Sequence, residues 1–431
     1  MTIISFFLIL FAIIAIGVPV AVVFGGMAIL PCLLDGTFPY TVEAAIRSMV
    51  SGLDSFTLLA VPLFMLSGII MARGGISEKL FNFFAYFIGN KTAGMPCAVI
   101  CTCMFYGAIS GSSPATVSAV GAMTIPFLVS LGYDKVFATS IVTVAGGLGV
   151  IIPPSISYIV YSSASGASPS ALFIGGIIPG LLIGAALMAF AYIQCKKSGE
   201  DKERLAENYQ KIHDKGFWPL FKESFAALLT PVIILGSIYG GIASPTEAAA
   251  ISVVYAMTVS IFVYKTLKPG EIGTMFVEGA KTYVTILFII SAATAFGRAM
   301  TLLQYPTMIS QGILTHISSK ILIILVMNVI LLVFGMIMDN IPNIMIFTPI
   351  FLPVATSIGM DPVHFGIMMT ANLAIGMVTP PMGINLYVAS SMTDIPVIKI
   401  AKACVPFLIA FLIALVLISY IPQLSLLLTG I

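Results

Sequence analysis

Long apolar runs recur along the chain from Met1 to Ile431, and short polar connections separate them. One helical crossing of a bilayer core about 30 Å thick needs roughly 20 apolar residues, and about a dozen stretches of the chain supply them. The pattern predicts an all-α polytopic membrane protein. The first run, MTIISFFLILFAIIAIGVPVAVVFGGMAIL, is too long for the core of a signal peptide and has no Lys or Arg before it, so we expect an uncleaved first span.

Basic residues orient the expected spans, which lie near residues 170–195, 225–243, 248–264 and 282–304. Seven of the 19 Lys and Arg residues fall between Lys196 and Lys222, and the positive-inside rule places this loop in the cytoplasm. The same assignment brings further basic residues to the cytoplasmic side: Arg73, Lys79, Lys91, Lys135, Lys265, Lys268, Lys281, Lys399 and Lys402. We therefore expect a cytoplasmic N-terminus and an external C-terminus.

An internal repeat relates the two halves of the chain at an offset of about 227 residues. GVIIPPSISYIVYSS, which begins at Gly149, matches GMVTPPMGINLYVAS, which begins at Gly376. Further matches lie upstream: Asp134 with Asp361, Pro126 with Pro353 and, after a shift of one residue, Pro114 with Pro342. Because the charge pattern gives corresponding spans opposite directions, we expect two inverted repeats, an arrangement found in secondary transporters.

Each repeat contains two interruptions of its apolar pattern. A long segment, Met95 to Leu131 in one half and Ile321 to Ile358 in the other, is broken by GAISGSSP or GMIMDNIPN. Both ends of each segment are assigned to the same side of the membrane, so each is expected to form a re-entrant helical hairpin with its tip at the break. The second interruption is a double proline, which removes amide donors and predicts unwound backbone over 149–154 and 376–381.

These features divide the chain into five parts. In the first repeat we expect scaffold spans with an interfacial helix near 77–91 in residues 1–94, and a hairpin, broken helix and following span in 95–194. A basic cytoplasmic loop follows in 195–224. The second repeat supplies scaffold spans with an interfacial helix near 305–319 in residues 225–320, and a hairpin, broken helix and last span in 321–431.

Unwound backbone at membrane depth needs binding partners, because unsatisfied N–H and C=O groups are costly in lipid. Carbonyls and hydroxyls at helix ends suit a cation such as Na⁺, and free amides at half-helix N-termini suit an anionic substrate. The pattern predicts a sodium- and substrate-binding site made by Ser110, Gly111, Ser112, Ser113, Pro114, Thr116, Gly149, Pro153, Pro154, Ser155, Gly335, Asp339, Asn340, Pro342, Gly376, Thr379, Pro380, Pro381, Gly383 and Asn385. Within this set, the candidate Na⁺ ligands are Ser110, Ser113, Asp339 and Thr379. No cofactor other than this coupling ion is expected.

The candidates also have purely structural alternatives. Small residues and hydroxyls pack membrane helices closely, and double prolines kink spans, but four such motifs repeated at one offset favour a binding site. A carboxylate at position 339 favours cation handling, although Asp339 would also serve as a cap on the second helix of its hairpin. Arg298 either contacts substrate or extends to the external interface. Glu247 is best explained as a first-turn charge at a helix start.

Composition narrows the class further. The chain is 59% hydrophobic and 8% charged, which excludes an ordinary soluble domain, and its net charge of +2 gives no sign of a nucleic-acid partner. The six cysteines mostly lie in apolar stretches, which favours core packing over metal or redox chemistry. The three histidines are isolated, and no HExxH, nucleophile elbow or P-loop is present, so we expect no enzymatic activity.

Several long motifs together resemble a known family over nearly the whole chain. They are SFTLLAVPLFMLSGIIM (55–71), GAISGSSPATVSAVGAMTIP (107–126), IIPPSISYIVYSSASGASPSALFIGGIIPG (151–180), SPTEAAA (244–250), MDNIPNIMIFTPIFLPV (338–354) and TPPMGINLYVASS (379–391). In these motifs the chain resembles the large membrane subunit, DctM-like or M-type, of tripartite ATP-independent periplasmic (TRAP) transporters, which belong to the ion-transporter superfamily.

The resemblance implies a sodium-driven importer of a small organic acid in the bacterial inner membrane. It implies an elevator motion, in which the hairpins and broken helices form a transport body that moves against the scaffold. It also implies two partners, a separate small membrane subunit (Q-type) and a periplasmic substrate-binding protein (P-type). Two sodium sites would use the tip around Ser110 to Ser113 with the second-half break, and the region Gly149 to Pro154 with its counterpart around Thr379.

Two other functions remain open at this point. A stand-alone sodium and dicarboxylate symporter of the same superfamily would take up free substrate without a binding protein. A passive channel, from a different class, would conduct without any dependence on sodium. An intramembrane hydrolase is a weaker alternative, because Ser110 or Ser113 would need a base and the histidines are remote in sequence.

Overall fold

The computed structural model describes residues 3–34, 36, 38–214 and 216–430, and the regular elements in these ranges are all helices. Seven helical segments among them are long and apolar enough to cross a membrane by length and composition: Phe56–Arg73, Ser113–Ser130, Pro169–Ser198, Phe217–Tyr239, Pro245–Val263, Pro269–Leu302 and Val397–Tyr420. The predicted all-α polytopic class is confirmed.

The first apolar run forms two short helices instead of one continuous span. α1 (Ile3–Ala15) and α2 (Val20–Leu34) are joined by a turn in which Gly17 has a φ of 93°. Pro19 follows in this turn, where it blocks continuation of α1 because it has no amide hydrogen to donate. Apolar character alone did not reveal this break.

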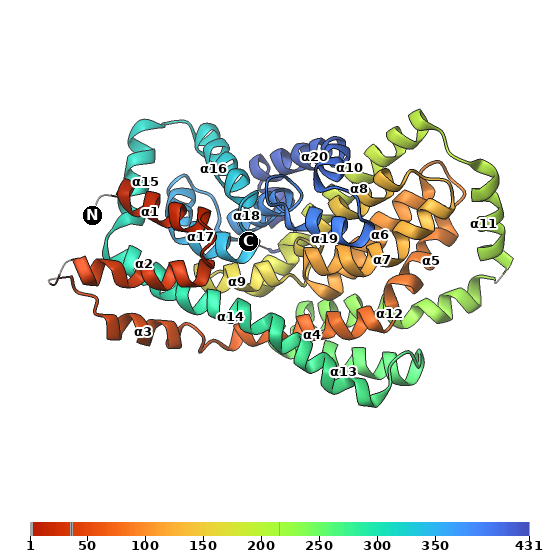
Figure 1. Ribbon diagram of the computed structural model, residues 1–431, viewed down its shortest axis with the longest axis horizontal. Coiled ribbons are helices and arrows are strands. Elements are labelled where there is room, and N and C mark those ends of the chain that lie inside the picture. The colour runs from red at the N-terminus through yellow and green to blue at the C-terminus, as the bar shows by residue number, and fades with distance from the viewer. Residues whose placement is uncertain (1–2, 35, 37, 215, 431) are drawn as a thin grey trace.

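Two helix pairs in the expected scaffold repeat one packing arrangement. α2 packs along α14 (Ile272–Leu302), and α4 (Ala60–Arg73) packs along α13 (Pro245–Thr258), as can be followed in the lower part of Figure 1. The sequence offset places α2 on α13 and α4 on α14, so each pair is the counterpart of the other, as two repeats related by a two-fold axis require. The other α-helices in the expected scaffold are α1, α3 (Val42–Ser51), α5 (Ile76–Ile88), α12 (Phe217–Tyr239) and α15 (Tyr305–His316).

The first long broken segment folds back on itself as α6 (Gly94–Ser110) and α7 (Ser113–Ser130), which pack against each other. A single carboxylate joins its two ends: Glu200 accepts a hydrogen bond from the Ala93 amide at 3.0 Å and one from the Tyr133 hydroxyl at 2.5 Å. Burial raises the pKa of Tyr133 and the neighbouring Glu200 raises it further, so the phenol keeps the proton that it donates. The predicted re-entrant hairpin is confirmed.

The second broken segment forms the equivalent hairpin from α16 (Lys320–Gly335) and α17 (Asn340–Ser357). Its two ends also meet, because Ile321 near the start of α16 and Met360 just after α17 line one cavity of about 340 Å³. The Tyr420 hydroxyl at the end of α20 (Val397–Tyr420) donates to the Ile321 carbonyl at 3.0 Å and fixes this base.

Both double prolines interrupt helices where expected. In the first repeat α8 (Lys135–Ala145) tightens into a 3₁₀ turn over Gly146–Val150, and α9 begins only at Ile156 and runs to Ser165. In the second, α18 (Pro362–Gly376) ends before the prolines and α19 (Ile384–Thr393) begins after them. The Pro153–Pro154 and Pro380–Pro381 peptide bonds are both cis. In the first repeat α10 (Pro169–Ser198) follows α9.

Two helices of the second repeat begin earlier than expected, at the ends that the charge pattern assigns to the cytoplasmic side. α14 begins at Ile272 instead of near 282, and α12 begins at Phe217 instead of near 225. The expected loop 195–224 itself contains a helix, α11 (Lys202–Asp214). Charged residues such as Glu278 and Lys281 ended the apolar pattern but not the helix, because they are ordinary helix formers. α5 and α15 are separate helices as expected, and their place at the membrane interface stays a prediction.

Candidate functional site

The tip of the first hairpin is a two-residue break with strong local causes. α6 ends at Ser110, and Gly111 follows in the left-handed conformation with φ 61°, which glycine adopts without strain. α7 then begins at Ser113 with Pro114 in its first turn, a position where the missing amide is not needed. The Ser110 hydroxyl lies 3.1 Å from that of Thr116, whose hydroxyl donates to the Ser112 carbonyl at 2.8 Å. Hydroxyls therefore gather at this tip.

This tip packs directly on the broken helix of its own repeat. A Cβ on Gly107 would lie 2.7 Å from the Gly149 Cα, and one on Gly149 would lie 2.7 Å from the Ser112 carbonyl oxygen, so neither position has room for a side chain. The Ile156 amide donates to the Gly111 carbonyl at 3.2 Å and joins the start of α9 to the tip. The buried Ser155 hydroxyl donates to the Val150 carbonyl at 2.5 Å across the break.

The second repeat has the same construction. A Cβ on Gly376 would lie 2.6 Å from the Gly335 Cα, so α18 and α16 touch where the tip meets the break. The Met382 amide donates to the Met336 carbonyl at 3.0 Å. Asp339 accepts from the Asn340 amide at 2.7 Å and caps α17, so the capping role considered for this carboxylate is present. Each hairpin tip therefore meets the break of its own repeat.

Contacts between the repeats are made by two asparagines. The Asn385 side-chain amide, after the second break, donates to the Ser113 hydroxyl at 2.7 Å and to the Thr143 carbonyl at 3.2 Å. The Asn340 side-chain amide, at the second tip, donates to the Ser157 hydroxyl after the first break at 3.4 Å. The Oδ1 atoms of both asparagines are buried and accept no hydrogen bond within the described part of the chain. Two buried oxygens are thus left available to a ligand.

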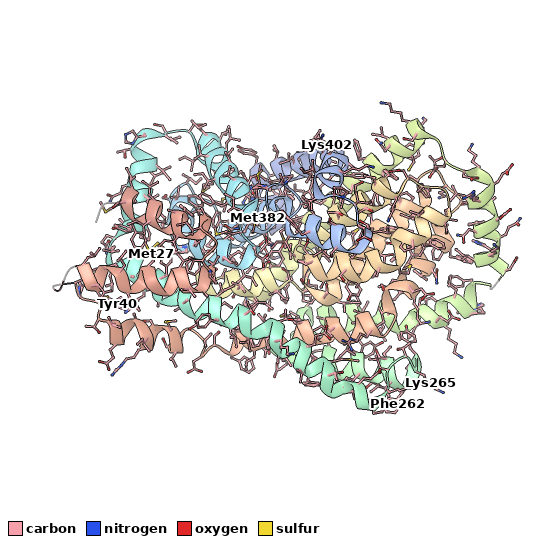
Figure 2. All side chains as sticks on the ribbon, viewed as in Figure 1. Met27, Tyr40, Phe262, Lys265, Met382 and Lys402 are labelled. Atoms are coloured by element: carbon pink, nitrogen blue, oxygen red, sulfur yellow. The ribbon has the colours of Figure 1, made fainter. Side chains whose placement is uncertain are left out.

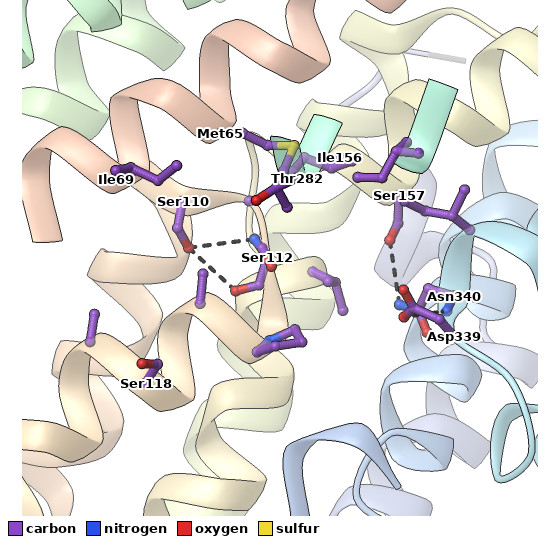
Figure 3. Close-up of a pocket in the computed structure, with 18 of the residues that line it drawn as sticks. Met65, Ile69, Ser110, Ser112, Ser118, Ile156, Ser157, Thr282, Asp339 and Asn340 are labelled. Carbon is purple, nitrogen blue, oxygen red and sulfur yellow. Dashed lines mark hydrogen bonds between the residues drawn. The ribbon is translucent and has the colours of Figure 1, made fainter. Parts of the chain in front are cut away.

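A cavity of about 600 Å³ lies where the two tips face α4 and α14. Figure 3 shows Ser110 and Ser112 on one side of it, with Asp339 and Asn340 on the other. Six predicted residues line the cavity: Ser110, Gly111, Ser112, Pro114, Asp339 and Asn340. Both hairpin tips therefore contribute to the lining of one cavity.

The other predicted residues lie outside the cavity lining. They are Ser113, Thr116, Gly149, Pro153, Pro154, Ser155, Gly335, Pro342, Gly376, Thr379, Pro380, Pro381, Gly383 and Asn385. Of the candidate sodium ligands, Ser110 and Asp339 face the cavity and Ser113 contacts Asn385, whereas the Thr379 hydroxyl donates to the Ile375 carbonyl of its own helix at 2.8 Å.

The two breaks differ in their exposure. Pro153 and Pro154 are buried, but Pro380 and Pro381 are exposed, and Met382 after them is 54% exposed. Met382 is labelled in Figure 2. The repeat predicted the same role for the two double prolines, but their surroundings differ: the first pair is buried and the second is exposed. The physical reason is that different neighbours cover the two halves, which a repeat in sequence does not specify.

Arg298 does not line the cavity. Its side chain is exposed on α14, beyond the last cavity-lining residue of that helix, Ile289. This cavity therefore gives Arg298 no contact, and both alternatives considered for it, a substrate contact and extension to the external interface, stay predictions.

One wall of the cavity was missed in the sequence analysis. α4 contributes Met65, Gly68, Ile69, Ala72 and Arg73, and α14 contributes Glu278, Thr282, Thr285, Ile286 and Ile289. The α14 residues recur every three or four positions and so share one helix face, a signal that the sequence contains. Arg73 and Glu278 form an ion pair between the two helices.

Comparison with known proteins identifies the family. Residues 7–424 match the family described as tripartite ATP-independent periplasmic transporter, DctM component. The chain is 42% identical over 415 residues to the isethionate TRAP transporter permease protein DctMQ of Oleidesulfovibrio alaskensis, covering 96% of this chain but 64% of that protein. It is 39% identical over 390 residues to the C4-dicarboxylate TRAP transporter large permease protein DctM of Pseudomonas aeruginosa, covering 90% of each.

A third relative agrees with this assignment, and one solved structure shares the fold. The sialic acid TRAP transporter large permease protein SiaM of Vibrio cholerae is 35% identical over 390 residues, covering 90% of this chain and 89% of that one. The crystal structure of the Alcanivorax borkumensis YdaH transporter has the same fold, with a TM-score of 0.61, 14% identity and 86% of each chain covered. The chain therefore belongs to the DctM component family of tripartite ATP-independent periplasmic transporters and is a multi-pass protein of the inner membrane.

Proposed function

We propose that this chain is the large permease subunit of a sodium-driven importer of small organic anions. The relatives are named for isethionate, C4-dicarboxylates and sialic acid, and each of these carries a sulfonate or carboxylate group. The cavity between the hairpin tips, with room of about 600 Å³, is of the size that holds a small organic molecule. Its polar lining comes mainly from hydroxyl groups of Ser110, Ser112, Ser118, Ser157, Thr282 and Thr285.

The observation that carries this proposal is that both hairpin tips meet at that cavity, with Ile156 and Ser157 after the first break and Met377 at the second break beside them. The N-terminal ends of α7 and α17 lie at its wall. At α7 the Ser112 side chain does not cap the first amides, and free amides at a helix N-terminus favour an anion. At α17 the Asn340 amide already donates to Asp339, so α7 is the helix end that offers donors to a carboxylate or sulfonate.

Sodium coupling is supported by the two asparagine oxygens without donors. The Nδ2 atoms of Asn385 and Asn340 donate to the Ser113 and Ser157 hydroxyls, and the Oδ1 atom of each side-chain amide is buried without a donor in the described part of the chain. Oxygen ligands of this kind suit a small hard cation. We propose one Na⁺ beside the first tip, where Ser110 to Ser113 meet Asn385, and a second beside the second tip near Asp339 and Asn340.

An elevator motion is supported by the division of the cavity wall. α4 and α14 belong to the paired scaffold helices, whereas the opposite wall belongs to the two hairpins. A cavity at the boundary between a rigid pair and a hairpin body is where sliding of one against the other would carry a bound solute. We therefore propose that the hairpins and broken helices move with substrate and sodium along the scaffold.

Two partners complete the proposal: a small membrane subunit and a periplasmic binding protein that delivers the substrate. The family description names a tripartite system, and several relatives are named as its large permease. This chain spans 64% of the isethionate relative, which is named DctMQ. We propose that the small subunit of the present system is a separate chain.

The experiment is uptake by proteoliposomes that contain the chain, with and without its two partners. Succinate, isethionate and N-acetylneuraminate are tested as solutes under an inward sodium gradient and in sodium-free buffer. We expect uptake only with sodium and with the binding protein. Full uptake of free solute without the binding protein would instead identify a stand-alone symporter, and sodium-independent flux with single-channel currents would identify a passive channel.

A further inference from the structure

The cavity has one basic side chain in its wall. Among the residues that line it, those with charged groups are Arg73, Glu278 and Asp339. Arg73 is the last residue of α4 and Glu278 lies in the second turn of α14, so the guanidinium and the carboxylate meet between two scaffold helices. Neither residue belongs to the hairpins or the breaks.

The backbone around Arg73 is held firmly in place. The next residue, Gly74, has no room for a Cβ because the Ser260 hydroxyl lies against it, and its carbonyl accepts from the Thr266 hydroxyl at 3.2 Å. The segment that follows α13 therefore fixes the end of α4. The backbone position from which the Arg73 side chain extends is thus fixed at the cavity wall.

Stability is a poor explanation for this ion pair. The side chains of Arg73 and Glu278 are 45% and 49% exposed, and solvent screening leaves such pairs with little effect on folding. A guanidinium has five N–H donors in a planar fork, and one carboxylate cannot use them all. Arg73 therefore keeps donors for a second acceptor in the cavity.

We propose that Arg73 is the anion-recognition residue of the cavity and that Glu278 is an exchangeable partner, displaced when a carboxylate or sulfonate of the substrate binds. This inference rests on the proposed function, because it assigns a contact to the organic anion proposed there. A sulfonate or carboxylate can match the guanidinium fork through two parallel hydrogen bonds, whereas Glu278 accepts a hydrogen bond from Arg73 Nη2 through one carboxylate oxygen. Glu278 would then compete with substrate and favour its release.

The test compares Arg73→Gln with Glu278→Gln in the full chain purified in detergent with sodium. The measured quantity is the Kd for whichever of the three screened anions the wild-type assembly transports. If Arg73 recognises the anion, the two substitutions should change the Kd in opposite directions. Arg73→Gln should weaken binding about tenfold or more, as expected for loss of a charge-assisted hydrogen bond, and Glu278→Gln should tighten it by removing the competitor.

Arg73→Lys separates charge from geometry. Lysine keeps the positive charge but lacks the planar fork, so its Kd should lie between those of wild type and Arg73→Gln. The matched control is the exposed pair Arg47 and Glu43 on α3, which does not line the cavity. Arg47→Gln and Glu43→Gln should leave the Kd unchanged.

Several results would overturn the inference. Equal shifts of Kd in the same direction for Arg73→Gln and Glu278→Gln, or no shift in either, would show that the pair only joins two helices. If Arg73→Gln fails to fold, Glu278→Gln decides alone: tighter binding supports the inference, and weaker or unchanged binding contradicts it. If the Kd results contradict the role of Arg73 but wild-type uptake depends on sodium, only this inference fails and the proposed function stands. If the wild-type assembly transports none of the three anions, the proposed function and this inference both fail.

Discussion

The side-chain amide of Asn385 donates a 2.7 Å hydrogen bond to the hydroxyl of Ser113, and this contact joins the second repeat to the tip of the first. Both residues are fully buried, and the Asn385 oxygen accepts no hydrogen bond in the described part of the chain. A buried acceptor without a donor is uncommon, because it loses water and gains nothing in return. A bound cation would remove that cost.

Asn385→Ala should therefore weaken sodium binding and stability together. The substitution removes the side-chain amide that donates to the Ser113 hydroxyl and the Thr143 carbonyl, and leaving these buried acceptors without a donor costs about 1–3 kcal/mol of folding free energy. The sodium concentration for half-maximal uptake should rise, and the rise in melting temperature on adding sodium should shrink. Asn90→Ala, at an exposed position, is the control, and equal sodium dependence in both variants would contradict the assignment.

Substitutions at the two tips should lower the sodium affinity of uptake without unfolding the protein. We expect this of Asp339→Ala, and of Ser110→Ala combined with Ser113→Ala, because each removes oxygens from a proposed ion site. Uptake as a function of sodium concentration measures the effect, and size-exclusion chromatography checks the fold. Ser118→Ala removes another cavity-lining hydroxyl, beyond the first turn of α7, and should leave the sodium dependence unchanged. An unaltered sodium dependence in both tip variants would rule out these ligands.

Gly149→Ala and Gly376→Ala should each destabilise the protein and abolish uptake. An added Cβ would press on backbone atoms of Ser112 or Gly335, and overpacking of this kind costs about 1–3 kcal/mol, or more where the backbone cannot shift. Scanning fluorimetry in detergent would report the loss as a lower melting temperature. The control is Gly297→Ala in α14, which has open space around it and should be neutral or slightly stabilising. Similar melting temperatures for all three variants would contradict the close approach.

Glu200→Ala should loosen the base of the first hairpin. The Ala93 amide and the Tyr133 hydroxyl would both lose their acceptor. Amide hydrogen exchange should then become faster at residues 93–97 and 131–137 and stay unchanged at the second hairpin, because local opening depends on local hydrogen bonds. Tyr133→Phe removes one of the two bonds and should give a smaller change. Exchange that rises equally throughout the chain would indicate general destabilisation instead.

Local patterns were sufficient to predict the elements that carry the site. The left-handed Gly111, the first-turn Pro114 and the double prolines each act on the backbone within a few residues, so the two hairpins and two breaks could be placed from sequence. The repeat could be found in the same way, because Asp134 and Asp361 cap corresponding helices at one fixed offset. Charge counting was less informative about helix ends, as the earlier start of α14 shows.

Tertiary packing decided which of the candidate residues meet and which of them face the cavity. Asn385 contacts Ser113 across 272 positions of the chain, and Arg73 contacts Glu278 across 205, and no local signal connects the members of either pair. Packing of the tips and breaks against one another places Ser110 and Asp339 at the cavity, whereas the Thr379 hydroxyl donates to the Ile375 carbonyl four residues earlier. The close approaches of Gly107 to Gly149 and of Gly376 to Gly335 hold these segments together, and only the folded chain brings them about.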